Sequence, residues 1–295
     1  MATESKNNSG SAYFLLFALA VIWGSSFILM KRGLLLFTPL QIGCLRMFTA
    51  SLVMIPFAIK NFRSVKPEHW KFLIASGLFG NAIPSILFPL AQTGISSALA
   101  GMINTLTPIF TLLIGFLIFG ASHAKKNIFG LLIGFAGALL LISGGGRDIQ
   151  HGTFGASLYV VAATVCYAIS MNILRHKLNT LNPLTITSFA LLFVGIPMGA
   201  AFFFTGLPQQ LTPASHVALP VVSIILLGVI GTAVSTVLFN RLIQLSGTLV
   251  ASSVTYLIPI VATIWGLLDG EHLIWSHFAG LMLILSGVYL INRKP

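Results

Sequence analysis

Ten apolar stretches, each long enough to cross a lipid bilayer, follow one another along the chain with only short connections. A spanning helix needs about 20 apolar residues. The stretches lie at roughly 13–31, 39–59, 71–91, 95–119, 127–144, 154–173, 184–205, 218–240, 248–268 and 274–291. Charged residues make up only 7% of the sequence, against about 25% in soluble domains. The sequence therefore predicts an all-α integral membrane protein with ten transmembrane helices.

Lysine and arginine are distributed unevenly between the two sides of such a bundle. With a cytoplasmic amino terminus, most of the 16 basic residues fall on the inner side and Arg46 lies inside a helix. The inner residues are Lys6, Lys60, Arg63, Lys66, Lys71, Lys125, Lys126, Arg175, Lys177, Arg241, Arg293 and Lys294, and the outer ones are Lys31, Arg32 and Arg147. Basic loops are retained in the cytoplasm, so both termini are predicted to be cytoplasmic. Basic loops facing anionic lipid also explain the net charge of +11, and nucleic acid is not expected as a partner.

The second half of the chain repeats the first. At a shift of 151 and then 150 residues, the matched positions include Gly80 and Gly231, Phe88 and Phe239, Pro108 and Pro259, and Gly120 and Gly270. We therefore expect one five-helix repeat over residues 1–146 and a second over 152–293. Because five is an odd number, the second repeat enters the membrane from the opposite side, and the two repeats are inverted. Inverted repeats are typical of secondary transporters, whose substrate site lies near the midplane between the copies.

Several short motifs follow in order along the chain. They are Trp-Gly-Ser-Ser-Phe at Trp23 to Phe27, Pro39 followed by Arg46, Ala98 to Gly120 with Thr107-Pro108, Gly231 to Phe239 with Asn240-Arg241, Ser252 to Pro259, and Gly270-Glu271. In this order and spacing, the sequence resembles the drug/metabolite transporter (DMT) superfamily, specifically its EamA-type branch of ten-helix transporters, over nearly its whole length. One position departs from the family pattern: the acidic residue that commonly follows the glycine ending the fourth helix is Ala121 here, whereas its counterpart Glu271 is present.

The resemblance implies a central cavity lined mainly by the third, fourth, eighth and ninth helices, with contributions from the first, second, sixth and seventh. It places the fifth and tenth helices at the periphery. Those two helices carry glycines at positions 130, 134, 137, 280 and 287 and almost no polar side chains between them. Small residues at such spacings let helices pack closely in lipid, so helix packing is their expected role.

Two prolines near the middle of predicted helices mark candidate sites. Pro108 and Pro259 each remove one backbone hydrogen bond and crowd the carbonyl four residues earlier, at Asn104 and Thr255. In hydrocarbon, a freed carbonyl must be satisfied by protein or by water in a cavity. The kinks therefore either line a polar path or are satisfied by side chains of their own helices, and the sequence leaves both readings open.

Polar and aromatic side chains near these kinks complete the candidate lining. The polar candidates on the third and eighth helices are Asn81, Ser85, Thr232, Ser235 and Thr236, and the aromatic candidates are Trp23, Tyr167 and Tyr256. Pairs four residues apart, such as 81 with 85 and 232 with 236, share one helical face. The polar residues either face the cavity or join helices to one another, and the aromatic residues either form cavity walls or pack in the core.

Arg46 is the only strong charge well inside a predicted span. A charge within the membrane is costly to bury and points to function by default. It would attract a carboxylate or phosphate group of a substrate. The alternative is structural, because the long side chain can also extend to the outer surface or bind carbonyls of its own protein.

All five acidic residues and all seven histidines lie outside the predicted spans or at their edges. Proton-coupled carriers usually place such groups along the path, so a facilitator or exchanger is favoured, and sodium coupling through oxygen ligands stays open. Neither HExxH nor GxSxG occurs, so an enzyme is not expected. Cys44 and Cys166 lie within predicted helices, which suggests neither a disulfide nor a metal site. We expect no cofactor.

The sequence as a whole predicts a multi-pass transporter of small organic metabolites in the bacterial cytoplasmic (inner) membrane. The resemblance suggests amino acids or related solutes as the small-molecule substrate, moved by an exporter or by a facilitator or exchanger. A lipid flippase and a non-transporting assembly subunit remain alternatives. The sequence leaves the oligomeric state open, with a homodimer as one option.

Overall fold

The computed structural model describes residues 2–120, 125–143, 152–206, 217–252 and 254–292, and these residues are helical apart from short connections. The uninterrupted helices are α1 (Ala2–Gly33), α2 (Pro39–Asn61), α7 (Lys125–Ser143), α8 (Gly152–Lys177), α9 (Pro183–Phe202), α12 (Val254–Leu268) and α13 (Trp275–Asn292). The composite helices are α3 (Trp70–Gly77), η3 (Leu78–Ala82) and α4 (Ile83–Gln92); α5 (Ser97–Ile103), η4 (Asn104–Leu106) and α6 (Thr107–Phe119); and α10 (Ala218–Gly228), η6 (Val229–Val234) and α11 (Ser235–Ser252). Two short turns, η1 (Phe62–Ser64) and η2 (Pro67–His69), join α2 to α3.

The helices are long and apolar enough for a membrane. Within the described residues, seven spans reach the length and hydropathy needed to cross a bilayer, and three further apolar helices are shorter. Large apolar side chains such as Phe116, Leu117, Ile118 and Leu268 are exposed on the outside of the bundle. In water such a surface would be unfavourable, whereas in a bilayer it faces lipid. The expected all-helical, multi-pass membrane fold is thus confirmed.

The second helix of each half begins with the same local signals. Thr38 precedes Pro39 at the start of α2 and caps it together with Gln41 in a reciprocal capping box. Asn182 precedes Pro183 at the start of α9, and its side chain accepts a hydrogen bond from Leu184 N at 2.9 Å. A polar N-cap followed by proline at the first helical position is a preferred helix start. These two starts are 144 residues apart, so the second helix of each half begins at an equivalent position.

Two helices contain a π-helical turn at equivalent places. The turn η3 begins at Leu78 and η6 begins at Val229, which matches the shift of 151 residues. Each turn holds a glycine, Gly80 or Gly231. In η6 the hydroxyl of Thr232 donates to the carbonyl of Leu227, five residues earlier, at 2.9 Å. Single π turns inside α-helices are frequent at functional sites, and both of these turns border the cavity described below.

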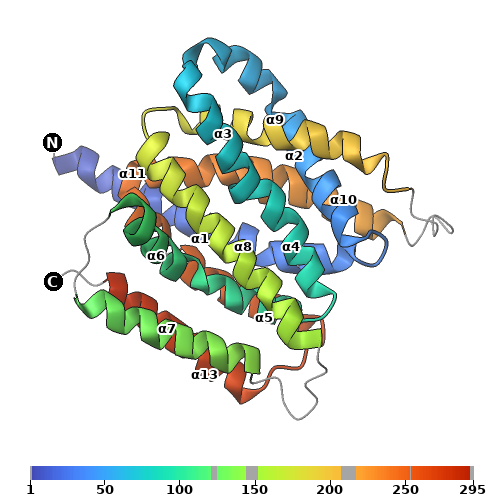
Figure 1. The fold of residues 1–295 in the computed structure, drawn as a ribbon, viewed down its shortest axis with the longest axis vertical. Coiled ribbons are helices and arrows are strands. Elements are labelled where there is room, and N and C mark those ends of the chain that lie inside the picture. The colour runs from blue at the N-terminus through green and yellow to red at the C-terminus, as the bar shows by residue number, and fades with distance from the viewer. Residues whose placement is uncertain (1, 121–124, 144–151, 207–216, 253, 293–295) are drawn as a thin grey trace.

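The two halves pack against each other in a reciprocal way. Helix α1 contacts α10, α11 and α12 of the other half, and α8 contacts α3, α4 and α6. Helices α2 and α9 pack on each other, and so do α7 and α13, which run side by side along one edge of the bundle (Figure 1). A Cβ atom added to Gly137 would lie 2.7 Å from the carbonyl oxygen of Gly280. The glycines of α7 and α13 therefore allow a close helix contact, as expected.

The structure differs from the sequence prediction between the eighth and ninth spans. The polar residues from 241 to 247 suggested a connection, but α11 stays helical to Ser252 and α12 follows from Val254. Polar side chains do not end this helix because they find partners: the Gln244 side chain donates to the carbonyl of Leu181 at 3.0 Å. The expected boundary between the two repeats falls in the segment 144–151, which lies outside the described residues, as does Ala121.

An ionic cluster joins three elements at the end of the bundle where α1 ends, which the basic residues predict to be the outer end. The Lys31 ammonium lies 2.6 Å from the Asp269 carboxylate and 2.7 Å from that of Glu271. Arg32 also pairs with Asp269. The Glu271 carboxylate accepts hydrogen bonds from Ser97 N at 2.9 Å, from Ser97 Oγ at 2.8 Å and from Ala98 N at 3.0 Å. Glu271 therefore caps the first turn of α5 from a distant part of the chain.

Several effects act on the charge of Glu271. Burial raises the pKa of its carboxyl, but the hydrogen bonds from Lys31, Ala98 and Ser97 outweigh burial and hold that pKa below its ordinary value of 4.5. The amino end of a helix also favours a negative charge, because its first N–H groups have no partners within the helix. The carboxylate is thus stabilised in its ionised form at neutral pH.

Candidate substrate cavity

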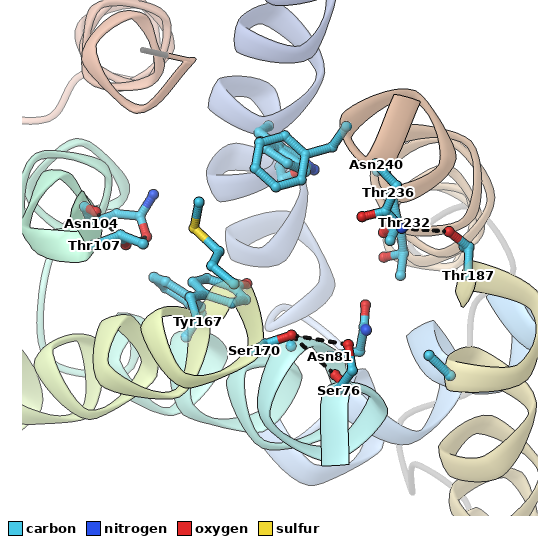
Figure 2. A pocket seen from close by; sticks show the side chains of 18 of the residues that line it. Ser76, Asn81, Asn104, Thr107, Tyr167, Ser170, Thr187, Thr232, Thr236 and Asn240 are labelled. Carbon is cyan, nitrogen blue, oxygen red and sulfur yellow. Dashed lines mark hydrogen bonds between the residues drawn. The ribbon is translucent and has the colours of Figure 1, made fainter. Parts of the chain in front are cut away.

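A cavity between the two halves gathers most of the polar candidates. Its volume is about 140 Å³, counted over positions open to the centre of a water molecule. Residues from α1, α2, α3, η3, α4, η4, α6, α8, α9, η6, α11 and α12 line it. Within the described part of the chain, α7 and α13 contribute no lining residue. Figure 2 shows polar side chains of both halves facing one another across the opening.

Equivalent residues of the two halves form opposite walls of this cavity. Helix α1 contributes Trp23, Ser26, Phe27 and Met30, and helix α8 contributes Tyr167, Ser170, Met171 and Leu174. Each residue in the second set follows its counterpart by 144 positions. The lining thus repeats the internal symmetry of the sequence, and the cavity lies where the two copies meet.

Aromatic contacts are exchanged between the halves in matching pairs. The rings of Trp23 and Phe239 have centroids 4.9 Å apart, and those of Tyr167 and Phe88 are stacked at 5.8 Å. Phe88 and Phe239 are equivalent at the shift of 151. In addition, the Trp23 Nε1–H donates to Ser235 Oγ at 3.0 Å. Trp23 and Tyr167 therefore form part of the cavity wall, and each is fixed by the third helix of the other half.

Glycines in the π turns let the opposing helices approach. A Cβ atom on Gly80 would collide with the hydroxyl of Ser170, and one on Gly231 would lie 3.1 Å from the hydroxyl of Ser26. Ser170 also shares a hydrogen bond of 3.1 Å with Ser76 (Figure 2). At both contacts a glycine of the π turn meets a serine of the opposing helix, Ser170 of α8 at η3 and Ser26 of α1 at η6. Because these residues are small, they do not fill the cavity beside them.

Arg46 faces the cavity rather than the outer surface. Its side chain is buried, with 8% of the residue exposed, and it is one of the lining residues. Its Nε–H donates to Thr232 Oγ1 at 2.8 Å. Helices α2 and α10 approach closely at this level, because a Cβ atom on Gly228 would lie 2.9 Å from the carbonyl oxygen of Arg46. This approach brings Arg46 within reach of η6.

Eight of the predicted site residues line the cavity, and they are Trp23, Arg46, Asn81, Asn104, Tyr167, Thr232, Thr236 and Thr255. Three others are not among its lining residues, and they are Ser85, Ser235 and Tyr256. Ser85 is fully buried against Gly43 of α2 and donates to the carbonyl of Ala82 at 2.7 Å. Ser235 accepts from Trp23 and donates to the carbonyl of Gly231 at 2.8 Å. The Ser85 hydroxyl thus bonds within its own helix, and the Ser235 hydroxyl also joins its helix to α1.

The two prolines are buried and are not lining residues. The carbonyl of Asn104, which Pro108 leaves without its usual donor, accepts a hydrogen bond from the Thr107 hydroxyl at 2.9 Å. The short 3-10 turn η4 lies at this point. The backbone N–H and the hydroxyl of Thr107 thus both satisfy the freed carbonyl, while the side chains of Asn104 and Thr107 remain on the cavity wall (Figure 2).

Other lining residues were not among the sequence candidates. They include Ser26, Ser170, Phe88, Phe239, Thr187 and Asn240. The Asn240 amide donates to Thr187 Oγ1 at 3.0 Å and so joins α11 to α9. The repeat provides a signal for two of them, because Phe88 and Phe239 are matched positions in helices already proposed to face the cavity. No comparable signal pointed to Thr187.

The electrostatic character of the cavity is simple. Among the described lining residues, Arg46 is the only charged group, and none is an aspartate, glutamate or histidine. The remaining polar groups are hydroxyls, side-chain amides and the Tyr167 phenol. Such a lining can bind a solute by hydrogen bonds and aromatic contacts and can attract one negative charge.

Comparison with known proteins agrees with this architecture. Residues 10–143 and 154–293 each match the EamA-like transporter family. An uncharacterized transporter of Archaeoglobus fulgidus is 26% identical over 95% of this chain and 99% of its own length. The uncharacterized inner membrane transporter YedA of Escherichia coli K12 is 25% identical over 95% of this chain and 92% of its own.

Two further comparisons bear on function and on fold. A probable amino-acid metabolite efflux pump of Salmonella typhimurium LT2 is 24% identical over 94% of this chain and 93% of its own. One crystal structure superposes with a TM-score of 0.64 at 17% identity, covering 95% of this chain and 96% of the other. At that identity the superposition supports the fold alone.

The family match covers both halves of the chain and nearly its whole length. It agrees with the apolar spans, the repeated halves and the shared cavity, and it identifies a family of transporters rather than of enzymes. The protein is a multi-pass integral membrane protein that belongs to the EamA-like transporter family.

Proposed function

We propose that the protein is a secondary transporter of amino acids or related small metabolites, working by alternating access. The observation that carries this proposal is the cavity itself, which lies between two repeated halves and is lined by equivalent residues of both. In transporters built from inverted repeats, the site lies where the copies meet, and rocking of one copy against the other exposes it to each side in turn. The transported solute would bind against Trp23, Tyr167 and the polar groups of η3 and η6.

The chemistry of the lining favours a facilitator or an exchanger. Proton-driven carriers usually place a carboxylate or imidazole along the path, and the described cavity lining contains neither. Hydroxyl and amide groups suit a polar, zwitterionic or amphipathic solute. The resemblance to the Salmonella typhimurium protein, a probable amino-acid metabolite efflux pump, supports export of amino-acid-like compounds, and the resemblance to YedA supports a bacterial inner membrane location.

Counterflow in proteoliposomes tests this proposal. Purified protein is reconstituted, and exchange of a labelled panel of amino acids and metabolites is measured without an ion gradient and then with an imposed pH gradient. Exchange without a gradient, absent from protein-free liposomes, supports a facilitator or exchanger. Concentrative uptake that requires the pH gradient would replace that mechanism with proton coupling. If no compound moves under either condition, a lipid flippase or an assembly subunit becomes the better explanation.

A further inference from the structure

Arg46 is a buried cation without a carboxylate partner in the described part of the chain. The ion pairs found there all belong to Lys31 and Arg32. Among the residues that the structure describes, the only hydrogen-bond partner of the Arg46 side chain is Thr232, whose Oγ1 accepts from Nε at 2.8 Å. The Thr232 hydroxyl uses its own hydrogen for the carbonyl of Leu227 at 2.9 Å. Thr232 therefore orients the guanidinium without neutralising it.

The internal repeat shows that this charge is not balanced or duplicated by the other half. Arg46 lies seven positions after Pro39, and Ala190 lies seven positions after Pro183. Both residues line the cavity. The walls of the cavity are thus paired in geometry, but only the first half supplies a charge. At this pair of equivalent positions on the neighbouring helices α2 and α9, a solute meets one cation and one apolar methyl group.

An unpaired buried charge is costly unless a ligand or water compensates it. Guanidinium has a planar array of N–H donors that matches the two oxygens of a carboxylate. A phosphate monoester would bring about two negative charges at neutral pH against one positive charge, and the described lining offers no second cation. A single carboxylate is therefore the group that balances the site.

The other lining residues indicate which chemical groups the solute carries besides its carboxylate. Trp23, Phe88, Tyr167 and Phe239 surround the cavity with aromatic rings. Amides and hydroxyls, including Asn81 (Figure 2), offer hydrogen bonds but no negative charge. The remainder of the solute is therefore held by hydrogen bonds and aromatic contacts, which suits an amino acid with an apolar side chain or a simple carboxylic acid.

We propose that Arg46 binds the carboxylate of the transported solute, and that the protein selects small amphipathic compounds with one free carboxylate. This inference rests on the proposed transport function. Arg46 is then a specificity-determining residue, and Thr232 is a positioning residue that fixes the guanidinium.

The test compares acids with their carboxamides, which have nearly the same shape without the carboxylate charge. Pyruvamide is neutral, whereas leucinamide and phenylalaninamide keep the ammonium group and carry a positive charge, so the pyruvate pair isolates the carboxylate. Proteoliposomes are assayed for uptake of labelled leucine, phenylalanine and pyruvate, and for inhibition by each acid and by leucinamide, phenylalaninamide and pyruvamide. Choline and glucose serve as cationic and neutral solutes without a carboxylate. In the unmodified protein, the acids should inhibit about tenfold to a hundredfold more strongly than the amides, as expected when a charged hydrogen-bonded pair is lost.

Substitutions of Arg46 test whether this residue causes the discrimination between acids and amides. Arg46→Gln should raise the half-saturation concentration for the acid about tenfold or more while leaving the weak inhibition by the amide unchanged. Arg46→Lys, which keeps the charge but loses the planar fork, should recover part of the discrimination. Arg241→Gln is the matched control, because Arg241 is exposed on α11 and is not a lining residue. Monodisperse elution of each variant in detergent verifies folding.

The outcomes separate the two proposals. Transport of acids and amides with equal affinity, or of choline or glucose, would overturn the carboxylate inference while leaving the transporter proposal intact. Discrimination that survives in Arg46→Gln would also overturn the role of Arg46. No flux of any solute would overturn both proposals. The acid and amide comparison in the unmodified protein decides the substrate class even if the Arg46 variants fail to fold.

Discussion

Replacing Glu271 with glutamine should destabilise the protein at neutral pH, by an amount that follows from its contacts. The carboxylate accepts four hydrogen bonds, from Lys31 Nζ, Ser97 N, Ser97 Oγ and Ala98 N. Glutamine has one acceptor oxygen and one NH₂ donor. If its oxygen takes over the contacts with Lys31 and Ser97, its NH₂ group faces the Ala98 N–H, and two donors meet. One backbone N–H at the start of α5 then loses its acceptor.

The magnitude has two parts. A buried donor left without a partner costs about 1 to 3 kcal/mol, and Glu271 has only 4% of its side chain exposed. The hydrogen bond to Lys31 loses its ionic component, which is worth at most about 1 kcal/mol because the Lys31 side chain is 37% exposed and solvent screens such pairs. We expect Glu271→Gln to lower the free energy of unfolding by about 1 to 4 kcal/mol.

The pH dependence follows from the lowered pKa of Glu271. A carboxyl group whose pKa is lower in the folded state contributes stability that is fully present above its unfolded value of 4.5 and is lost as the pH falls through the folded pKa. The difference between the unmodified protein and Glu271→Gln should therefore be constant above about pH 5.5 and shrink below about pH 4.5.

Unfolding by SDS in mixed micelles, followed by tryptophan fluorescence across this pH range, measures both effects. Glu68→Gln is the matched control, because Glu68 is exposed in η2, and it should leave stability unchanged. Equal stability of Glu271→Gln and the unmodified protein at neutral pH would refute the capping argument. A loss of stability that does not depend on pH would show that the ionised carboxylate of Glu271 is not the source of the stabilisation.

Three further substitutions test hydrogen bonds beside the cavity and the contact of α7 with α13. Thr107→Val should lower the free energy of unfolding by about 1 to 2 kcal/mol, because the carbonyl freed by the proline loses its hydroxyl donor, as chemical denaturation would measure. Ser235→Ala should cost about 1 kcal/mol and change the indole emission of Trp23, read by fluorescence, because the Nε1–H loses its acceptor. Gly137→Ala should cost about 1 to 3 kcal/mol in the same denaturation assay, because the new methyl group would push α7 away from α13.

Thr107→Val and Gly137→Ala each have a control substitution elsewhere in the chain. The exposed Thr93 also donates to a carbonyl of its own helix, at 2.7 Å, and Thr93→Val should be close to neutral because water replaces the lost donor. Gly155 has open space around it, and Gly155→Ala should be neutral or slightly stabilising, since alanine favours helix more than glycine does. If Gly137→Ala left the free energy of unfolding unchanged, as expected for Gly155→Ala, the stability of the protein would not depend on the close contact of α7 with α13.

Hydropathy and internal repetition predicted the fold well because both depend on the whole chain rather than on single contacts. Apolar stretches must span the membrane, and the repeat of Pro108 at Pro259 revealed two similar halves. Most polar candidates near these prolines also line the cavity. The reason is that polar side chains in hydrocarbon face protein or water, and a cavity between two repeated halves satisfies that need.

The details that sequence could not supply depend on local register and on pairing across the chain. Asn81 lines the cavity while Ser85, four residues later, packs against Gly43 of α2, whereas both members of the equivalent pair, Thr232 and Thr236, line the cavity. The sequence placed Glu271 only in a motif at the edge of a span, because its partners Lys31 and Ser97 lie far away in sequence. The orientation of Arg46 could not be predicted either, since it depends on the position of Thr232 in the other half.

The two π turns also bear on the history of the chain. A turn closed by i→i+5 hydrogen bonds accommodates one residue more than an α-helical turn, so each marks an added residue. Both begin at equivalent residues, Leu78 and Val229. Two independent insertions at the same place would require a coincidence, whereas one insertion before the gene segment doubled explains both. The simplest history makes the irregular turn older than the ten-helix protein, already present in a five-helix ancestor.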